Sequence, residues 1–153
     1  MPGPGQAQPD IAGILVFTME DVRANEPGLP PSTVITAGGT LTLSSSFGVT
    51  GALAGLLTGE VFDVAHHVEN LETGTHTDLA GGAFTVPPPA TAGVIVYNSP
   101  TYTTGASGSG ANFEIPAGYA GGTFRILTHA HAANPTIRSI VAAFHDGLVI
   151  EVV

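Results

Sequence analysis

Apolar and polar residues alternate along much of the chain with a period of two, which is typical of half-buried β-strands. In segment 34–49, one face of the pattern is formed by Leu41, Leu43, Ser45, Phe47 and Val49. In segment 60–70, one face is formed by Phe62, Val64, His66 and Val68. We find no helix-period segment of ten or more residues. The pattern therefore predicts an all-β fold.

Glycine and proline turns divide this pattern into eight or nine predicted strands. The predicted strand segments are 10–20, 34–49, 60–70, 83–86, 93–97, 113–115, 123–131, 137–144 and 148–153. Short strands with frequent turns are typical of an antiparallel β-sandwich. Residues 52–57 are expected to form a loop or short helical turn over one end. Around His145-Asp146-Gly147 we favour a bulge within one long last strand over a hairpin turn.

The first 32 residues are predicted to form an arm on this domain. Residues 1–10 are rich in Pro, Gly and Gln, residues 10–20 form an apolar strand, and residues 21–32 carry three prolines and are expected to be a loop. Such a strand can pair within its own domain or with a neighbour's. We therefore predict an N-terminal arm over 1–32 and a sandwich over 33–153.

Charge is scarce, and this disfavours several classes of partner. Charged residues make up 10% of the chain, against about 25% in an average globular domain. The chain has no lysine, and its formal net charge is −9. Binding to nucleic-acid phosphates or to anionic membranes is therefore disfavoured. The chain also contains no cysteine, which excludes disulfides, zinc–thiolate sites and thiol catalysis.

The N-terminal residues do not resemble a secretory signal peptide, because they have neither a positively charged region nor a long apolar region. The longest apolar stretches, 11–17 and 52–57, are too short to span a bilayer. The sequence leaves open whether the protein stays in the cytoplasm or is exported by another route.

Three segments resemble elements of bacterial immunoglobulin-like and fibronectin type III-like domains. They are ITAGGTLTLS at 35–44, VFDVAHHVEN at 61–70, and FEIPAG followed by GGTFRIL between 113 and 127. Phe124 stands where these families place a corner tyrosine, and no Cys–Trp–Cys core is present. The resemblance implies an immunoglobulin-like sandwich used in adhesion, scaffolding or assembly, and no particular ligand.

The His-x-His pair is the main hint of chemistry. His129 and His131 lie two apart on a predicted strand and therefore share one face. If the strand of His67 is its neighbour, as the resemblance implies, then His67, Asp63 and Glu69 lie across from the pair. Imidazoles with a carboxylate suit zinc or another first-row divalent ion. The alternative is a set of solvated surface histidines with no ligand.

The other histidines favour structural interpretations. His66 faces the predicted core and is expected to be neutral with one hydrogen bond, His145 is expected in a turn, and His76 in a loop. A cupin-type site is disfavoured because no carboxylate follows His131 until Asp146. The chain also lacks the G-x-S-x-G and phosphate-loop motifs, so we find no positive sign of catalysis.

These observations favour a non-enzymatic subunit that associates with copies of itself, in a filament, shell or surface layer. The N-terminal strand could be exchanged between copies, and the candidate assembly residues are Ile11, Ile14, Leu15, Val16 and Phe17. The alternative is a monomeric module that binds a ligand or a divalent metal through His67, His129 and His131. Protonating all six histidines would change the formal net charge from −9 to −3, so self-association should strengthen between about pH 7 and pH 5.

Overall fold

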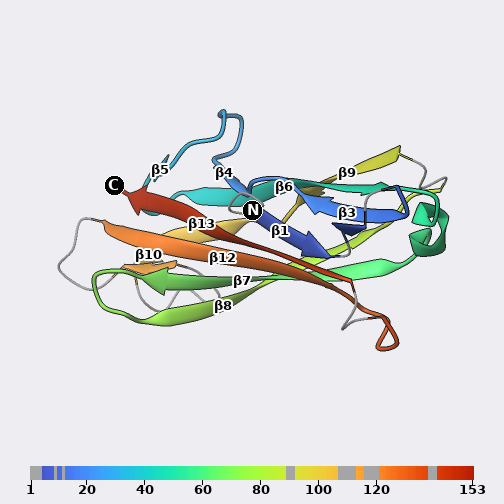
Figure 1. Ribbon diagram of the computed structural model, residues 1–153. Helices are drawn as coiled ribbons and strands as arrows, with labels where there is room; N and C mark the ends of the chain where they lie inside the picture. The colour runs from blue at the N-terminus through green and yellow to red at the C-terminus, as the bar shows by residue number, and fades with distance from the viewer. Residues whose placement is uncertain are drawn as a thin grey trace.

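The computed structural model shows two β-sheets packed face to face (Figure 1). The structure describes residues 5–8, 10–11, 13–88, 92–106, 113–115, 121–137 and 141–153. The predicted all-β sandwich is confirmed. Residues 116–118, the Pro-Ala-Gly part of the FEIPAG segment, lie outside the described residues.

The first sheet has six strands. Its order is β1 (Gly5–Gln8), β13 (Ala142–Val152), β12 (Gly122–Ala132), β7 (Val61–Asn70) and β8 (His76–Thr85), with β5 (Val34–Ile35) also paired to β13. The long pairs β13–β12, β12–β7 and β7–β8 are all antiparallel. Strands β7 and β12 are neighbours, as the resemblance implied.

The second sheet has seven strands and is built on the long strand β6 (Thr40–Thr50). Its order is β11 (Phe113–Ile115), β10 (Tyr102–Ala106), β6, β3 (Leu15–Met19) and β2 (Asp10–Ile11). Strands β4 (Arg23–Asn25) and β9 (Ala92–Asn98) also pair with β6. The short 3₁₀ helix η1 (Ala54–Leu57) connects β6 to β7, in the segment expected to be a loop or helical turn.

The core lies between the sheets and is centred on aromatic rings. Phe17 and Phe62 stack with ring centroids 5.0 Å apart, and Phe47 and Phe84 with centroids 4.4 Å apart. Each of these rings contributes about 2–3 kcal/mol through burial of its apolar surface. The predicted inner faces of β6 and β7 are confirmed, since every residue named for them above is buried.

Two bulges interrupt the first sheet. The β12–β13 register shifts where Ile126 faces Leu148 and Leu127 faces Asp146, which leaves Gly147 as the extra residue. The predicted bulge in one long last strand is therefore confirmed. His145 lies within this strand and is buried, so its placement in a turn was wrong. The β7–β8 register shifts in the same way and leaves Gly81 unpaired.

Several segments expected to be irregular form strands. Residues 5–8 pair with β13, and residues 23–25 of the predicted proline loop pair with β6. His76, expected in a loop, begins β8. These segments are short or rich in Gly, Thr and Pro, so their strand pairing depends on neighbours that local propensity does not reveal.

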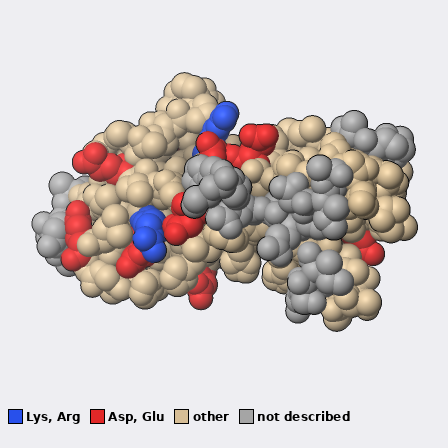
Figure 2. Space-filling model, in the orientation of Figure 1, with Lys and Arg blue, Asp and Glu red and all other residues tan. Residues whose placement is uncertain are grey.

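The surface carries few charges. Figure 2 shows scattered acidic and basic groups separated by wide neutral areas on the face that it displays. Arg125 lies between two acidic groups, with its Nε 3.5 Å from Glu69 and 3.7 Å from Asp146. Such exposed ion pairs contribute little stability, about 0–1 kcal/mol. Within the described part of the chain, no helix is long and apolar enough to cross a membrane.

Candidate functional site

His66 lies at the centre of a buried polar network that connects both sheets. The Tyr97 hydroxyl donates its single hydrogen to the carbonyl oxygen of Gly81, at 2.8 Å. The Tyr97 oxygen must therefore accept from Nε2–H of His66, at 3.0 Å. Nδ1 of His66 then accepts a hydrogen bond from the Thr128 hydroxyl, at 2.7 Å. His66 is thus a neutral core histidine, as predicted, with two hydrogen bonds where one was expected.

The protonation states within this network follow from burial. Burial, together with the nearby His129, lowers the pKa of His66 to about 4. Burial also raises the pKa of Tyr97. Both groups are therefore uncharged at neutral pH, and the network holds the sheets together through neutral hydrogen bonds.

The predicted metal ligands all lie on the outer face of the first sheet. In the β12–β7 register, His131 faces Asp63, His129 faces Ala65, and Leu127 faces His67. The rings of His129 and His131 are stacked with centroids 5.8 Å apart. We call this surface the histidine face and define it by His67, His76, Asp78, His129 and His131.

His76 and Asp78 are members of this face that sequence reasoning did not assign. Nδ1 of His67 lies 2.6 Å from Oδ1 of Asp78, and its Nε2 lies 3.1 Å from Nδ1 of His76. The signal was the alternation of His76 and Asp78 just after the turn that follows Asn70. A hairpin at that turn places both side chains on the same face as His67.

The histidine face is not a preformed metal site. Within the part of the chain that the structure describes, no three potential ligands converge as a metal ion would require. His67 already uses both ring nitrogens in contacts with Asp78 and His76. Partial burial and the neighbouring His131 lower the pKa of His129. A divalent ion bound by His67 would have to replace a present contact of His67 with Asp78 or His76.

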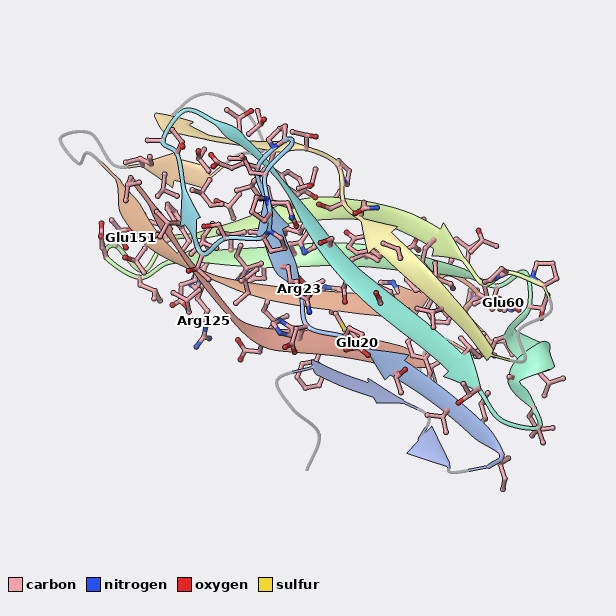
Figure 3. All side chains as sticks on the ribbon, turned by 90° about the horizontal axis from the view of Figure 1, so that it is seen from above. Glu20, Arg23, Glu60, Arg125 and Glu151 are labelled. Carbon is pink, nitrogen blue, oxygen red and sulfur yellow. The ribbon has the colours of Figure 1, made fainter. Side chains whose placement is uncertain are left out.

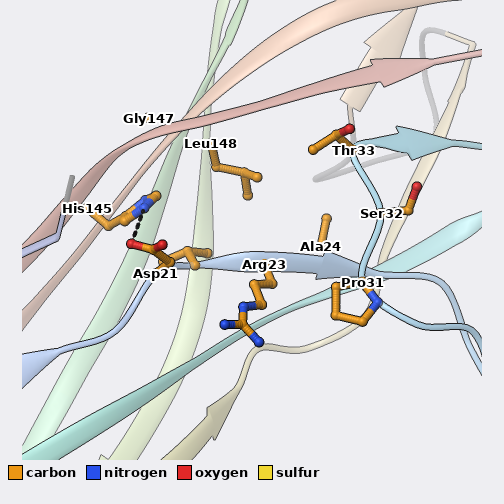
Figure 4. A pocket seen from close by; sticks show the side chains of 10 residues that line it. Asp21, Arg23, Ala24, Pro31, Ser32, Thr33, His145, Gly147 and Leu148 are labelled. Carbon is orange, nitrogen blue, oxygen red and sulfur yellow. Dashed lines mark ion pairs between the residues drawn. The ribbon is translucent and has the colours of Figure 1, made fainter. Parts of the chain in front are cut away.

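A second feature is a hollow of about 550 Å³ between β4, the segment before β5, and the bulge of β13 (Figure 4). His145 lines it and is only 3% exposed. Its Nε2 lies 3.7 Å from Oδ1 of Asp21, and its Nδ1 has no hydrogen-bond partner in the described structure. Burial lowers the pKa of His145, while Asp21 and Asp146 act in the opposite direction. The imidazole is therefore held neutral at the wall of an open hollow.

The candidate assembly residues of the N-terminal segment differ in their surroundings. Phe17 is fully buried in the core, Leu15 and Val16 are half-buried, and Ile14 is exposed. For Ile11 the structure gives the backbone, which pairs with Leu15. Strand β3 pairs with β6 of the same chain.

Exposed apolar side chains gather at one end of the sandwich. The carbonyl oxygen of Ile14 accepts a hydrogen bond from the N–H of Leu53, at 2.8 Å, which joins the β2–β3 turn to the segment before η1. Leu56, within η1, is 70% exposed, and Ile14 and Leu53 are also exposed. We call Ile14, Leu53 and Leu56 the apolar end.

Comparison with known proteins defines the fold and no more. No protein-family model matches the chain, and no curated protein sequence does. Among solved structures, the C-terminal domain of wzt is similar, with a TM-score of 0.52 and 12% identity over 97% of this chain and 77% of that chain. An alkylpurine DNA glycosylase of Pseudomonas fluorescens, AlkC, solved bound to DNA containing an abasic site analog, matches with a TM-score of 0.49 and 12% identity over 89% of this chain.

The chain spans only 30% of the length of that glycosylase. At such identities a likeness concerns the fold, and the glycosylase match is too weak to support any argument about activity. The protein is therefore an all-β, cysteine-free sandwich. The more specific resemblance to immunoglobulin-like and fibronectin type III-like domains remains a prediction from the sequence.

Proposed function

We propose that this protein is a non-catalytic structural subunit that acts by associating with copies of itself. The observation that carries this proposal is the apolar end, where three large aliphatic side chains lie exposed on neighbouring segments. Contiguous exposed apolar surface commonly marks an interaction site. The position of the histidines supports a non-catalytic role, because His66 is fully engaged inside the core and the histidine face lies on the outside of a sheet.

The N-terminal segment gives this proposal a mechanism. Ile14 of the apolar end directly precedes β3, whose Phe17 fills the core. Exchange of this strand between two copies would replace the β3–β6 pairing within a chain by the same pairing between chains. Such an exchange changes the free energy little, because every contact of Phe17 is made again in the partner.

The apolar end is tested by the mass of the purified protein in solution. Light scattering after size exclusion is expected to give a species larger than the 15.4 kDa chain. The Leu53→Glu/Leu56→Glu variant should shift this species towards the monomer. Leu29→Glu/Leu71→Glu is the matched control, because it adds the same charge at exposed leucines elsewhere. A parent that is monomeric at all concentrations would overturn the proposal.

Strand exchange is tested separately with cysteines, since the natural chain has none. Val16 of β3 faces Thr50 of β6. After oxidation of a Val16→Cys/Thr50→Cys variant, exchange gives covalent dimers on a non-reducing gel. Pairing within each chain gives only cross-linked monomers, and that result would remove exchange while leaving self-association in place.

A second candidate function is binding of a divalent metal at the histidine face. The contacts of His67 with His76 and Asp78 favour it, because they hold potential ligands on the strands beside His129 and His131, although no three of these groups converge yet. Calorimetric titration with zinc should show uptake by the parent and loss of uptake in His129→Ala/His131→Ala. His76→Ala should weaken uptake as well if the larger set is used. No uptake by the parent would end this candidate.

A further inference from the structure

The edges of the two sheets differ in how well they are protected against pairing with another strand. An unpaired edge strand can pair with a strand of another molecule unless it is short, charged or interrupted by a bulge. In the described structure five strands that pair on one side only are short. They are β1, β2, β4, β5 and β11, with four, two, three, two and three residues. The long edge strand β8 carries Asp78 and is interrupted at Gly81 and Gly82, where Gly82 has φ +87°.

Strand β9 has none of these protections. It is seven residues long, and in the described structure it pairs on one side only, with β6 (Figure 3). Its register with β6 runs without a break from Ala92 to Asn98. It contains no proline and no charged residue. This leaves a continuous row of backbone donors and acceptors along its outer edge.

The side chains of β9 add an apolar strip to this edge. Val94 and Val96 are 68% and 66% exposed. The alternate residues of the strand, Ile95 and Tyr97, face the core. The two valines form one wall of a shallow hollow of about 450 Å³. Its other lining residues are three serines of β6 and, farther from β9, three charged residues: Ser44, Ser45, Ser46, Glu20, Asp21 and Arg23. Two adjacent valines on the open face of an edge strand are an unfavourable surface for a monomer.

The distribution of charge favours a second copy as the partner. Residues 79–113, which include all of β9, carry no charged side chain and no histidine, whereas the whole chain has a formal net charge of −9. Two copies with this net charge repel each other, and β9 itself adds no charge to that repulsion. The strand is also self-complementary, because an antiparallel copy centred on Ile95 places Val94 opposite Val96.

We propose that β9 pairs edge to edge with β9 of a second copy, antiparallel about a two-fold axis at Ile95, so that the second sheets of two molecules form one continuous sheet. Val94 and Val96 of both copies then make one strip of four valines. Cross-strand pairs of β-branched residues contribute about 0.2–1 kcal/mol each, in addition to the new backbone hydrogen bonds. This inference rests on the proposed self-association and adds a second contact surface to the apolar end.

The first experiment replaces the strip by positive charge. Val94→Lys/Val96→Lys should weaken association about tenfold or more, because the pairing places lysine opposite lysine. The change also reduces the net negative charge, so weaker association cannot result from greater overall repulsion. Val34→Lys/Val149→Lys is the matched control, since it makes the same charge change at exposed valines of the first sheet, and it should associate at least as well as the parent.

The second experiment tests register and symmetry. Under oxidising conditions, a mixture of Val94→Cys and Val96→Cys chains should form disulfide-linked dimers faster than either variant alone, because the two-fold axis places residue 94 opposite residue 96. An unchanged association constant in Val94→Lys/Val96→Lys, or no preference for the mixed dimer, would overturn the β9 pairing. The self-association proposal would survive either result and would fail only if the parent were monomeric.

Discussion

His66 is a titratable side chain in the core, and its hydrogen bonds explain how the core accommodates it. Its two ring nitrogens bond to Thr128 on β12 and to Tyr97 on β9, so a single imidazole connects three strands of two sheets. A neutral histidine satisfies both partners, since one nitrogen donates and the other accepts. Protonation would add a second donor facing the Thr128 hydroxyl and a charge in a buried site.

This arrangement predicts that stability falls as the pH is lowered from about 6.5 to about 4. The pKa of His66 is about 4 in the folded protein, against 6.5 for an unperturbed histidine. The unfolded chain therefore takes up this proton first, which costs the folded state about 3 kcal/mol across that interval. Denaturant unfolding at several pH values measures the loss.

The control for this prediction is His66→Gln, which has no titrating group at the position. Its free energy of unfolding should be lower at pH 7 but should lose this part of the pH dependence. Equal pH dependence in the parent and in His66→Gln would contradict the assignment.

At the scale of elements, the bulge in β8 makes room for the same network. Gly81 is the extra residue of the bulge, and its carbonyl accepts from Tyr97. A Cβ at this position would lie 2.5 Å from the Tyr97 hydroxyl and 3.0 Å from Nε2 of His66. The close approach requires glycine here because the polar atoms of the network cannot retreat without losing their partners.

We therefore expect Gly81→Ala to lower the free energy of unfolding by about 1–3 kcal/mol, as overpacking in a core usually does. Gly105→Ala, in strand β10, is the matched control because a Cβ there has no atom within 4 Å. It should be neutral or slightly stabilising, since alanine reduces the entropy of the unfolded chain. Equal unfolding midpoints for the two variants would show that the bulge tolerates a side chain.

At the scale of the whole molecule, net charge opposes the association that the apolar end and β9 favour. The formal net charge of −9 becomes less negative as histidines are protonated. The structure makes this change smaller than the histidine count implies, because burial lowers the pKa of His66, His129 and His145. The folded chain therefore takes up fewer than six protons on histidine between pH 7 and pH 5.

Self-association should accordingly strengthen, moderately, as the pH falls from about 7 to about 5. Light scattering at fixed protein concentration measures the change. Added salt at pH 7 should act in the same direction, because it screens the repulsion between copies. A scattering signal that is insensitive to both pH and salt would show that charge does not limit association.

Much of the fold could be predicted from the sequence, because alternation is a local property. The inward faces of β6 and β7, the buried His66, and the bulge at Gly147 all follow from the order of residues within one segment. The outward position of His129 and His131 follows in the same way. A period of two determines which face a side chain occupies, whatever strand lies beside it.

Which residues meet was decided only by the tertiary structure. His76 stacks on His67 because β8 pairs beside β7, and His145 is buried because β13 passes the β4 segment. The open edge of β9 likewise depends on where other strands are absent in the described fold. The pairing and register of distant strands are long-range properties, and the single-residue bulge at Gly81 shifts the register of β8 in a way that local alternation does not contain.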